Sequence, residues 1–88
     1  MAGPAFLGVI RNPRTITISG HGNSSTDNCK VIRNADSVAR DIRVRFQVDS
    51  QDHIFRNVQP GDMIPTQGID RIYQTNTTAT FVEIFDLE

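Results

Sequence analysis

The sequence has almost none of the residues that usually reinforce small domains. It contains one cysteine, Cys29, and two histidines among 88 residues. A single cysteine cannot form a disulfide within the chain. Together with two isolated histidines it does not give the ligand spacing of a structural metal site. A chain of this length buries only about 60 to 68% of the surface that its unfolded form exposes. We therefore expect no metal and no cofactor, and we expect oligomerisation to supply stability.

An excess of charge and a long apolar run are also missing. The formal net charge is −1, with nine basic and ten acidic residues, which argues against a general affinity for nucleic acid or an anionic membrane. The apolar stretch 5–10 is interrupted by Gly8 and runs into Arg11, so neither a signal peptide nor a membrane span is expected. We expect a soluble protein, made in a cytoplasm, whose partners are proteins.

What the sequence does contain is period-two alternation. In residues 42–48 each even position is apolar and each odd position is polar or charged, and Asp49 continues the pattern, so 42–49 is predicted to be a strand with one face in water. Further strands are predicted at 15–19, 29–33, 53–58, 69–74 and 79–87, and the connection 34–41 is too short for a stable helix. The prediction is one all-β domain over 1–88, a small antiparallel β-sandwich or jelly-roll-like β-barrel of about six or seven strands, with 1–13 as an extended N-terminal arm.

Turn residues separate these strands. Pro60 and Gly61 occupy the second and third positions of the segment 59–62, which is the pattern of a type II turn, and Asn76 suits a left-handed position in a turn at 75–78. Pro65 is expected to cap a strand or to lie at a sheet edge. The segment 49–52 is predicted to be a hairpin loop, and 20–28, which has no apolar residue before Cys29, a mobile loop.

Catalytic and ligand-binding patterns are weak. The loop 20–28 holds the residue types of a nucleophilic triad, His21, Ser24 or Ser25, and Asp27, but nothing rigid orients them. Its sequence also differs from the dinucleotide-binding and Walker patterns, the two glycine-rich motifs that bind phosphate. His53 lies beside Asp52 and near Asp49, so a pH-sensitive contact between the histidine and a carboxylate stays open. Asp49 and Asp52 could also be ligands of a calcium ion. A strand-end histidine next to a solvated hairpin is the simpler interpretation. We expect the protein not to be an enzyme.

Two surfaces are candidates for contact with a partner. Arg43 and Arg45 share the polar face of their strand, and Arg71, with Arg56, extends it into a basic stripe if neighbouring strands align. Such a stripe suits carboxylates on a partner protein, while a solvated face and a nucleic-acid contact remain open. The strand 79–87 is apolar on both sides, so it is either central between two layers or half of a subunit contact. Its face with Phe81, Glu83 and Phe85 is the candidate contact.

Two C-terminal stretches carry a family resemblance. Residues 55–65, FRNVQPGDMIP, and 71–80, RIYQTNTTAT, resemble small tailed-phage and gene-transfer-agent virion proteins of the spike-base or head-decoration kind. In that family a strand ending in Phe-x-x-Val leads to Pro/Ala-Gly, a Leu/Ile-Pro, an Arg-Ile/Val and a Thr-Gly/Asn-Thr-Thr-Ala turn. Asn76 stands where those proteins often have glycine. The resemblance does not reach the first half of the chain.

The resemblance implies a non-enzymatic structural protein of the virion, either a capsid-decoration (cement) protein or a spike-base subunit. It implies a homo-oligomer, such as a trimer or a pentamer, that binds a major capsid or spike protein. A different function also stays open, that of a small carbohydrate- or ligand-binding β-module that uses the loops 20–28 and 49–52. The absence of tryptophan and the single tyrosine leave few aromatic platforms for a sugar.

Overall fold

The fold is all-β, as the alternation predicts. The computed structural model describes residues 9–18 and 23–87, with side chains except at 23–25 and 27. In these ranges the chain forms one sheet of six antiparallel strands in the order β1-β6-β2-β5-β3-β4. The strands are β1 (Ile10–Thr17), β2 (Asn23–Asn34), β3 (Arg40–Phe46), β4 (Asp52–Val58), β5 (Met63–Tyr73) and β6 (Phe81–Leu87). This part of the chain has no helix that could cross a membrane.

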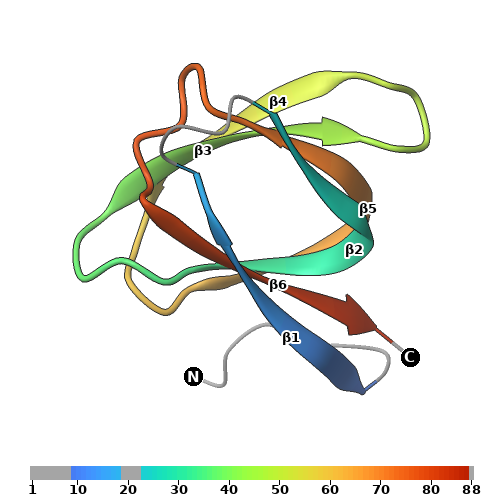
Figure 1. The fold of residues 1–88 in the computed structure, drawn as a ribbon, viewed down its shortest axis with the longest axis horizontal. Coiled ribbons are helices and arrows are strands. Elements are labelled where there is room, and N and C mark those ends of the chain that lie inside the picture. The colour runs from blue at the N-terminus through green and yellow to red at the C-terminus, as the bar shows by residue number, and fades with distance from the viewer. Residues whose placement is uncertain (1–8, 19–22, 88) are drawn as a thin grey trace.

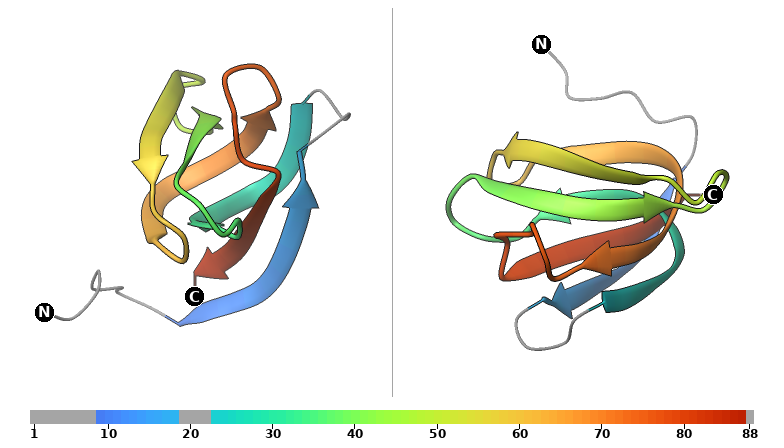
Figure 2. Two further views of the ribbon diagram at one scale, coloured as in Figure 1. Left: turned by 90° about the vertical axis from the view of Figure 1, so that its left-hand side faces the viewer. Right: turned by 90° about the horizontal axis from the view of Figure 1, so that it is seen from above.

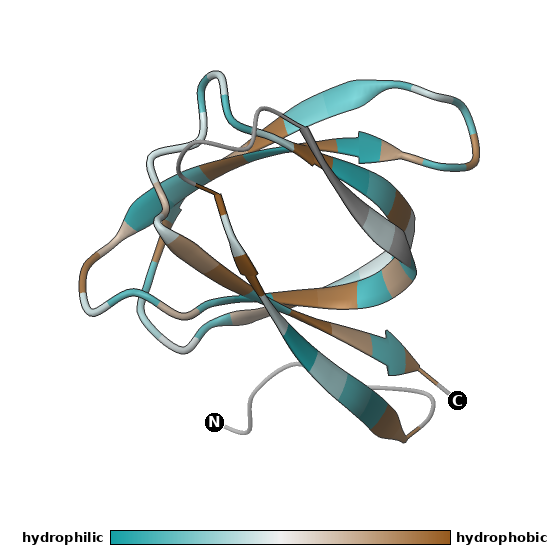
Figure 3. Cartoon of the chain, viewed as in Figure 1, coloured by the Kyte–Doolittle hydropathy of each residue, from teal (hydrophilic) through white to brown (hydrophobic). Residues whose placement is uncertain are grey.

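The sheet is rolled around a common interior, with β3 and β4 on one side and β1 and β6 on the other (Figures 1 and 2). The two longest strands, β2 and β5, pair with each other along most of their length and connect the two sides. Apolar and polar residues alternate along the strands (Figure 3). The inward-facing residues form the core, which comprises Ile18, Cys29, Ile32, Ile42, Val44, Val58, Ile69, Ile72, Ala79, Val82 and Ile84.

Strand β3 follows the alternation for most of its length. Ile42 and Val44 are fully buried, whereas Arg43 and Arg45 lie on the outer face. The predicted strand extended to residue 49, but β3 ends at Phe46 because a turn closes there. Ser50 has a φ of 57° and its N–H donates to the Phe46 carbonyl oxygen at 3.0 Å. Apolar Val48 is therefore left 68% exposed in the hairpin turn.

The prediction of a loop at 20–28 is wrong for residues 23–28. These residues form the first half of β2, in which 23–25 pair with Tyr73, Ile72 and Arg71 of β5, and the register shifts between Ser25 and Cys29. Strand pairing uses backbone groups, so a polar sequence can pair when its neighbour supplies the apolar side chains. Thr26 is fully buried and its hydroxyl donates to the Ile69 carbonyl oxygen. Residues 20–22 lie outside the described ranges.

Part of the predicted N-terminal arm belongs to the sheet. Residues 10–13 belong to β1, which pairs with β6, while residues 1–8 lie outside the described ranges. The register shifts between Arg11 and Arg14, where Asn12 has a φ of 56°. This irregularity, next to Pro13, is a β-bulge on one margin of the sheet.

Pro65 lies inside β5 rather than at its end. Its half of β5 pairs only with β2, opposite Val31, because β3 pairs with β5 no earlier than Ile69. A proline there faces no neighbour on its second side, which is locally the condition of an edge strand. Gly68, with a φ of 133°, separates the two halves of β5.

The predicted turns are present. Gly61 has a φ of 82° and the Asp62 N–H donates to the Gln59 carbonyl oxygen at 3.0 Å, as a type II turn requires. Asn76 has a φ of 67°. Its turn is closed by a bond from the Thr77 N–H to the Gln74 carbonyl oxygen, so it begins one residue earlier than predicted.

Candidate functional site

The arginines of the predicted stripe do lie on one face. Arg45 is opposite Arg71 and Arg43 is opposite Tyr73 in the pairing of β3 with β5. The Arg43 guanidinium carbon is 4.3 Å from the centre of the Tyr73 ring, a cation–π contact. Strand alignment thus brings together residues that are far apart in the sequence, as the stripe requires.

Carboxylates of the same chain neutralise much of this stripe. Arg45 donates to both oxygens of Asp70, at 2.9 and 2.8 Å, and Arg43 donates to Asp52 at 2.6 Å. These hydrogen bonds hold the pKa values of Asp70 and Asp52 below the usual range for aspartate. The face therefore presents alternating charges rather than a continuous positive surface. Of the three stripe arginines on β3 and β5, Arg71 is exposed, whereas Arg43 and Arg45 are half-buried.

The aromatic residues of the last strand differ in what they can offer to a partner. Phe81 is 43% exposed, whereas Phe85 is only 7% exposed and lies opposite the fully buried Val31. Glu83 is bound by Arg33 at 3.1 Å on the same outer face. Of the predicted contact residues on β6, Phe81 is the one that presents a large apolar surface, and Phe85 is covered by its own chain.

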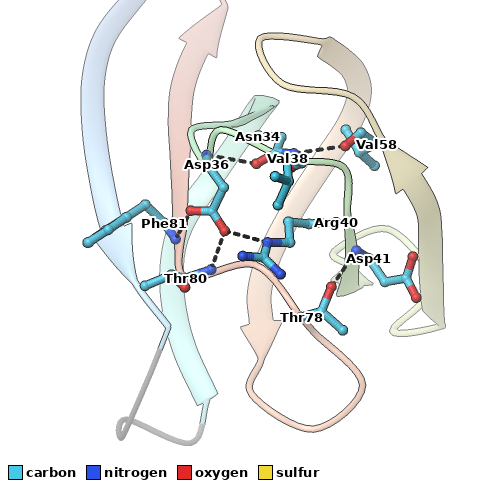
Figure 4. Close-up of polar contacts among 9 residues, drawn as sticks. All are labelled: Asn34, Asp36, Val38, Arg40, Asp41, Val58, Thr78, Thr80 and Phe81. Atoms are coloured by element: carbon cyan, nitrogen blue, oxygen red, sulfur yellow. Dashed lines mark hydrogen bonds and ion pairs between the residues drawn. The ribbon is translucent and has the colours of Figure 1, made fainter.

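The backbone that carries Phe81 is fixed by a half-buried polar cluster around Asp36 (Figure 4). The Asp36 carboxylate accepts hydrogen bonds from the N–H groups of Thr80 and Phe81, at 2.8 and 2.9 Å, and from the Arg40 side chain at 2.9 Å. Partial burial opposes the charged form of Asp36, but these hydrogen bonds outweigh it and lower its pKa. The connection between β2 and β3 is thereby attached to the start of β6.

Asn34 completes this cluster from within the core. Its side-chain amide donates to the carbonyl oxygens of Val38 and Val58, at 2.9 and 2.8 Å, and its carbonyl oxygen accepts from the Asp36 N–H at 2.8 Å. Asn34 is fully buried. Sequence reasoning missed both residues, because a polar stretch between two strands gives no indication that its side chains turn inward.

An apolar pocket opens beside β4. It has a volume of about 320 Å³ and is lined by Phe46, Val48, Asp49, Phe55, Pro65, Thr66 and Gln67. His53 borders these aromatic residues, with its ring centre 4.6 Å from that of Phe55 and 6.0 Å from that of Phe46. The histidine for which the sequence left a carboxylate contact open packs on two phenylalanines.

The remaining candidates give no assembled chemistry. Within the described ranges no three His, Cys, Asp or Glu side chains are grouped so that they could hold a metal ion. Burial raises the pKa of Cys29 to about 11, so its thiol stays protonated at neutral pH. The triad residues lie outside the described part of the chain, His21 entirely and Ser24, Ser25 and Asp27 by their side chains.

Comparison with known proteins finds no matching family model, no curated relative and no similar solved structure.

Proposed function

We propose that this protein is a non-enzymatic structural subunit that works by binding protein, both other copies of itself and a partner of a larger assembly. The observation that carries the proposal is the open sheet. Strand β4 lies at one edge of the sheet, and within the described ranges it pairs only with β3. An open edge is a template for a further strand, and β-strand addition is a common mode of protein recognition.

The particle is a virion in this proposal, and the subunit is a capsid-decoration protein or a spike-base protein. Support comes from the residues that resemble such proteins. Residues 55–65 and 71–80 build most of β4, both turns with positive φ at Gly61 and Asn76, and the two ends of β5. The resemblance therefore covers the side of the sheet with the open edge, together with the turn that leads to the exposed Phe81.

Sedimentation velocity at micromolar concentration tests the proposal. We expect a discrete oligomer, and we expect the protein to co-sediment with particles built from the major capsid protein encoded in the same genome. Phe81→Ser should weaken that co-sedimentation, with Thr15→Ser, an exposed change on β1, as the matched control. A monomer at all concentrations that also ignores capsids would contradict the proposal.

A second candidate function, a small ligand-binding module, is favoured by the pocket beside β4. Asp49, from the predicted loop 49–52, lines it together with Phe46 and Phe55. A glycan array and thermal-shift measurements with small apolar compounds distinguish this function. A ligand that raises the melting temperature of the wild-type protein but not of Phe55→Ala would favour it over the structural role.

A further inference from the structure

The free edge of β4 has a defined set of outward backbone groups. The Phe46 N–H donates to the Gln51 carbonyl oxygen at 2.9 Å, so Phe46 and Gln51 direct their backbone groups between β3 and β4. In an antiparallel ladder such pairs alternate, so His53 and Phe55, opposite Val44 and Ile42, also direct their backbone groups to β3. The backbone groups of Asp52 and Ile54 therefore point away from the sheet.

The usable edge is short and has a clear middle. On one side it ends at the hairpin turn, where Ser50 has a φ of 57°, and on the other at Asn57, which has a φ of 55°. The Asn57 N–H is already bound by the Asp41 carboxylate at 2.9 Å. The stretch 52–56 lies between these interruptions, and Ile54 is its central residue.

The side chains of this stretch are arranged so that the strand complements itself. Asp52, Ile54 and Arg56 lie on the outer face, and Asp52 and Arg56 carry opposite charges on either side of Ile54. If a second copy of β4 runs antiparallel with the two Ile54 residues opposite each other, Asp52 of each copy faces Arg56 of the other. On the inner face, His53 of each copy faces Phe55 of the other.

We propose that two copies of this chain pair through β4 about a two-fold axis at Ile54, which joins their sheets into one continuous sheet. This inference rests on the proposed function, because it names the surface through which the subunit binds itself. The register satisfies both outward backbone groups of each Ile54, since residues with free N–H and C=O groups are placed opposite each other. A two-fold contact of this kind uses the same surface on both copies.

The charged side chains near β4 favour a second copy of β4 over an unrelated strand as the pairing partner. Within one chain Arg43 is bound to Asp52 at 2.6 Å, and Arg56 lies 3.5 Å from Asp41. Across the two-fold axis, Asp52 of one copy faces Arg56 of the other. The two ion pairs then form a row of side chains with alternating charge: Arg43 and Asp52 of one copy, then Arg56 and Asp41 of the other. The Arg56 side chain is 71% exposed and therefore free to reach across. A foreign strand would have to carry an acid and a base at the same spacing.

The opposite margin of the sheet is less suited to pairing. Strand β1 carries the bulge between Arg11 and Arg14, and Pro13 within it has no N–H to donate. Prolines and bulges are the devices that keep edge strands from pairing. The pairing therefore yields an even number of copies, in contrast to the trimer or pentamer that the resemblance implies.

Charge reversal with mixing tests the register. Arg56→Asp places two aspartates opposite each other, and Asp52→Arg places two arginines opposite each other, so each variant alone should raise the dimer dissociation constant at least about tenfold. In a dimer of one variant with the other, positions 52 and 56 are both acidic in the first copy and both basic in the second. Every facing pair is then of opposite sign, so mixing the variants in equal amounts should restore a dimer close to wild-type affinity.

Two controls accompany the charge reversal. Circular dichroism checks that each variant folds. Arg71→Asp, an exposed reversal on β5, is the matched control and should leave the dimer intact. Dissociation of the Arg71→Asp dimer to the same extent would mean that net charge, rather than the facing of residues 52 and 56, decides the association, and this would count against the register.

A covalent test does not depend on charge. Ile54→Cys should form a disulfide-linked dimer under mild oxidation, since the two thiols face each other across the axis, while Cys29 is fully buried and does not compete. Thr15→Cys on β1 should link far less. An oligomer that survives Arg56→Asp and does not link through residue 54 overturns this pairing and leaves the proposed function standing. A wild-type protein that is always a monomer overturns both.

Discussion

At the scale of the residue, Asn34 is a polar side chain on which three chain segments depend. Asn34 lies at the end of β2, and its side-chain amide donates hydrogen bonds to Val38, in the connection to β3, and to Val58, at the end of β4. Asn34→Ala leaves these buried groups without partners, and a buried unpaired group costs about 1 to 3 kcal/mol. We expect a loss of at least about 2 kcal/mol in the free energy of unfolding, measured with urea. Gln51→Ala, at an exposed turn residue, should change it by less than about 0.5 kcal/mol.

Asp36 makes stability depend on pH in a predictable direction. Its pKa in the folded protein is lowered from 3.8, so its hydrogen bonds stabilise the fold at pH values above 3.8 and are lost as the pH falls through the lower native value. Asp36→Asn should therefore be less stable than the wild type at pH 7, and the difference should shrink below about pH 4. Urea unfolding at several pH values measures this difference.

Asp49→Asn, at the exposed hairpin turn, is the matched control for Asp36→Asn. Comparing each variant with the wild type cancels the contributions of Asp52, Asp70 and Asp86, whose pKa values are also lowered by hydrogen bonds from arginine. A difference in the free energy of unfolding between the wild type and Asp36→Asn that stays constant from pH 7 to pH 3 would contradict a stabilising role of the ionised Asp36 carboxylate.

At the scale of the element, Gly68 permits the change of direction in β5. A Cβ atom built at this position would lie 2.5 Å from the Asn28 side-chain oxygen and 3.3 Å from the Lys30 ammonium nitrogen. At Gly61, which also has a positive φ, the nearest atom would be 4.0 Å away. Gly61→Ala should cost about 1 kcal/mol from the backbone alone, and Gly68→Ala about 2 to 3 kcal/mol. Equal losses in urea unfolding would mean that Asn28 moves aside freely.

The elements differ in how far the sequence could predict them. Strand β3 was predictable because Ile42 and Val44 alternate with arginines and one face is wet. The first half of β2 was not, because its pairing depends on backbone groups and, among the side chains that the structure describes there, on the buried hydroxyl of Thr26. The cluster around Asp36 joins residues 44 and 45 positions apart, and no local pattern encodes such a contact.

The surfaces follow the same rule. That Arg43, Arg45 and Arg71 share a face could be anticipated from alternation. Their neutralisation by Asp52 and Asp70 could not, because it depends on the register and on the bulge beside Phe46. Exposure at Phe81 and burial at Phe85, on one face of one strand, likewise depend on which neighbours the rolled sheet brings to each end.

At the scale of the whole molecule, Cys29 reports on global opening. Its thiol is fully buried and its pKa is raised to about 11, so it is both inaccessible and protonated at pH 8. We expect it to react with a thiol reagent at least about a hundredfold more slowly than in the unfolded chain, with a rate that rises with urea. Ser37→Cys, at an exposed position, should react at once in the native protein. Fast labelling of Cys29 without denaturant would contradict the closed core.

The unequal margins of the rolled sheet also limit how large an association by strand pairing can become. A molecule with two equally receptive borders could recruit neighbours at both and grow into a ribbon without end. Here the bulge at Asn12 and Pro13 disfavours growth from β1, while β4 remains receptive. Association by strand pairing then stops at the dimer, and any larger assembly must form through contacts between side-chain surfaces.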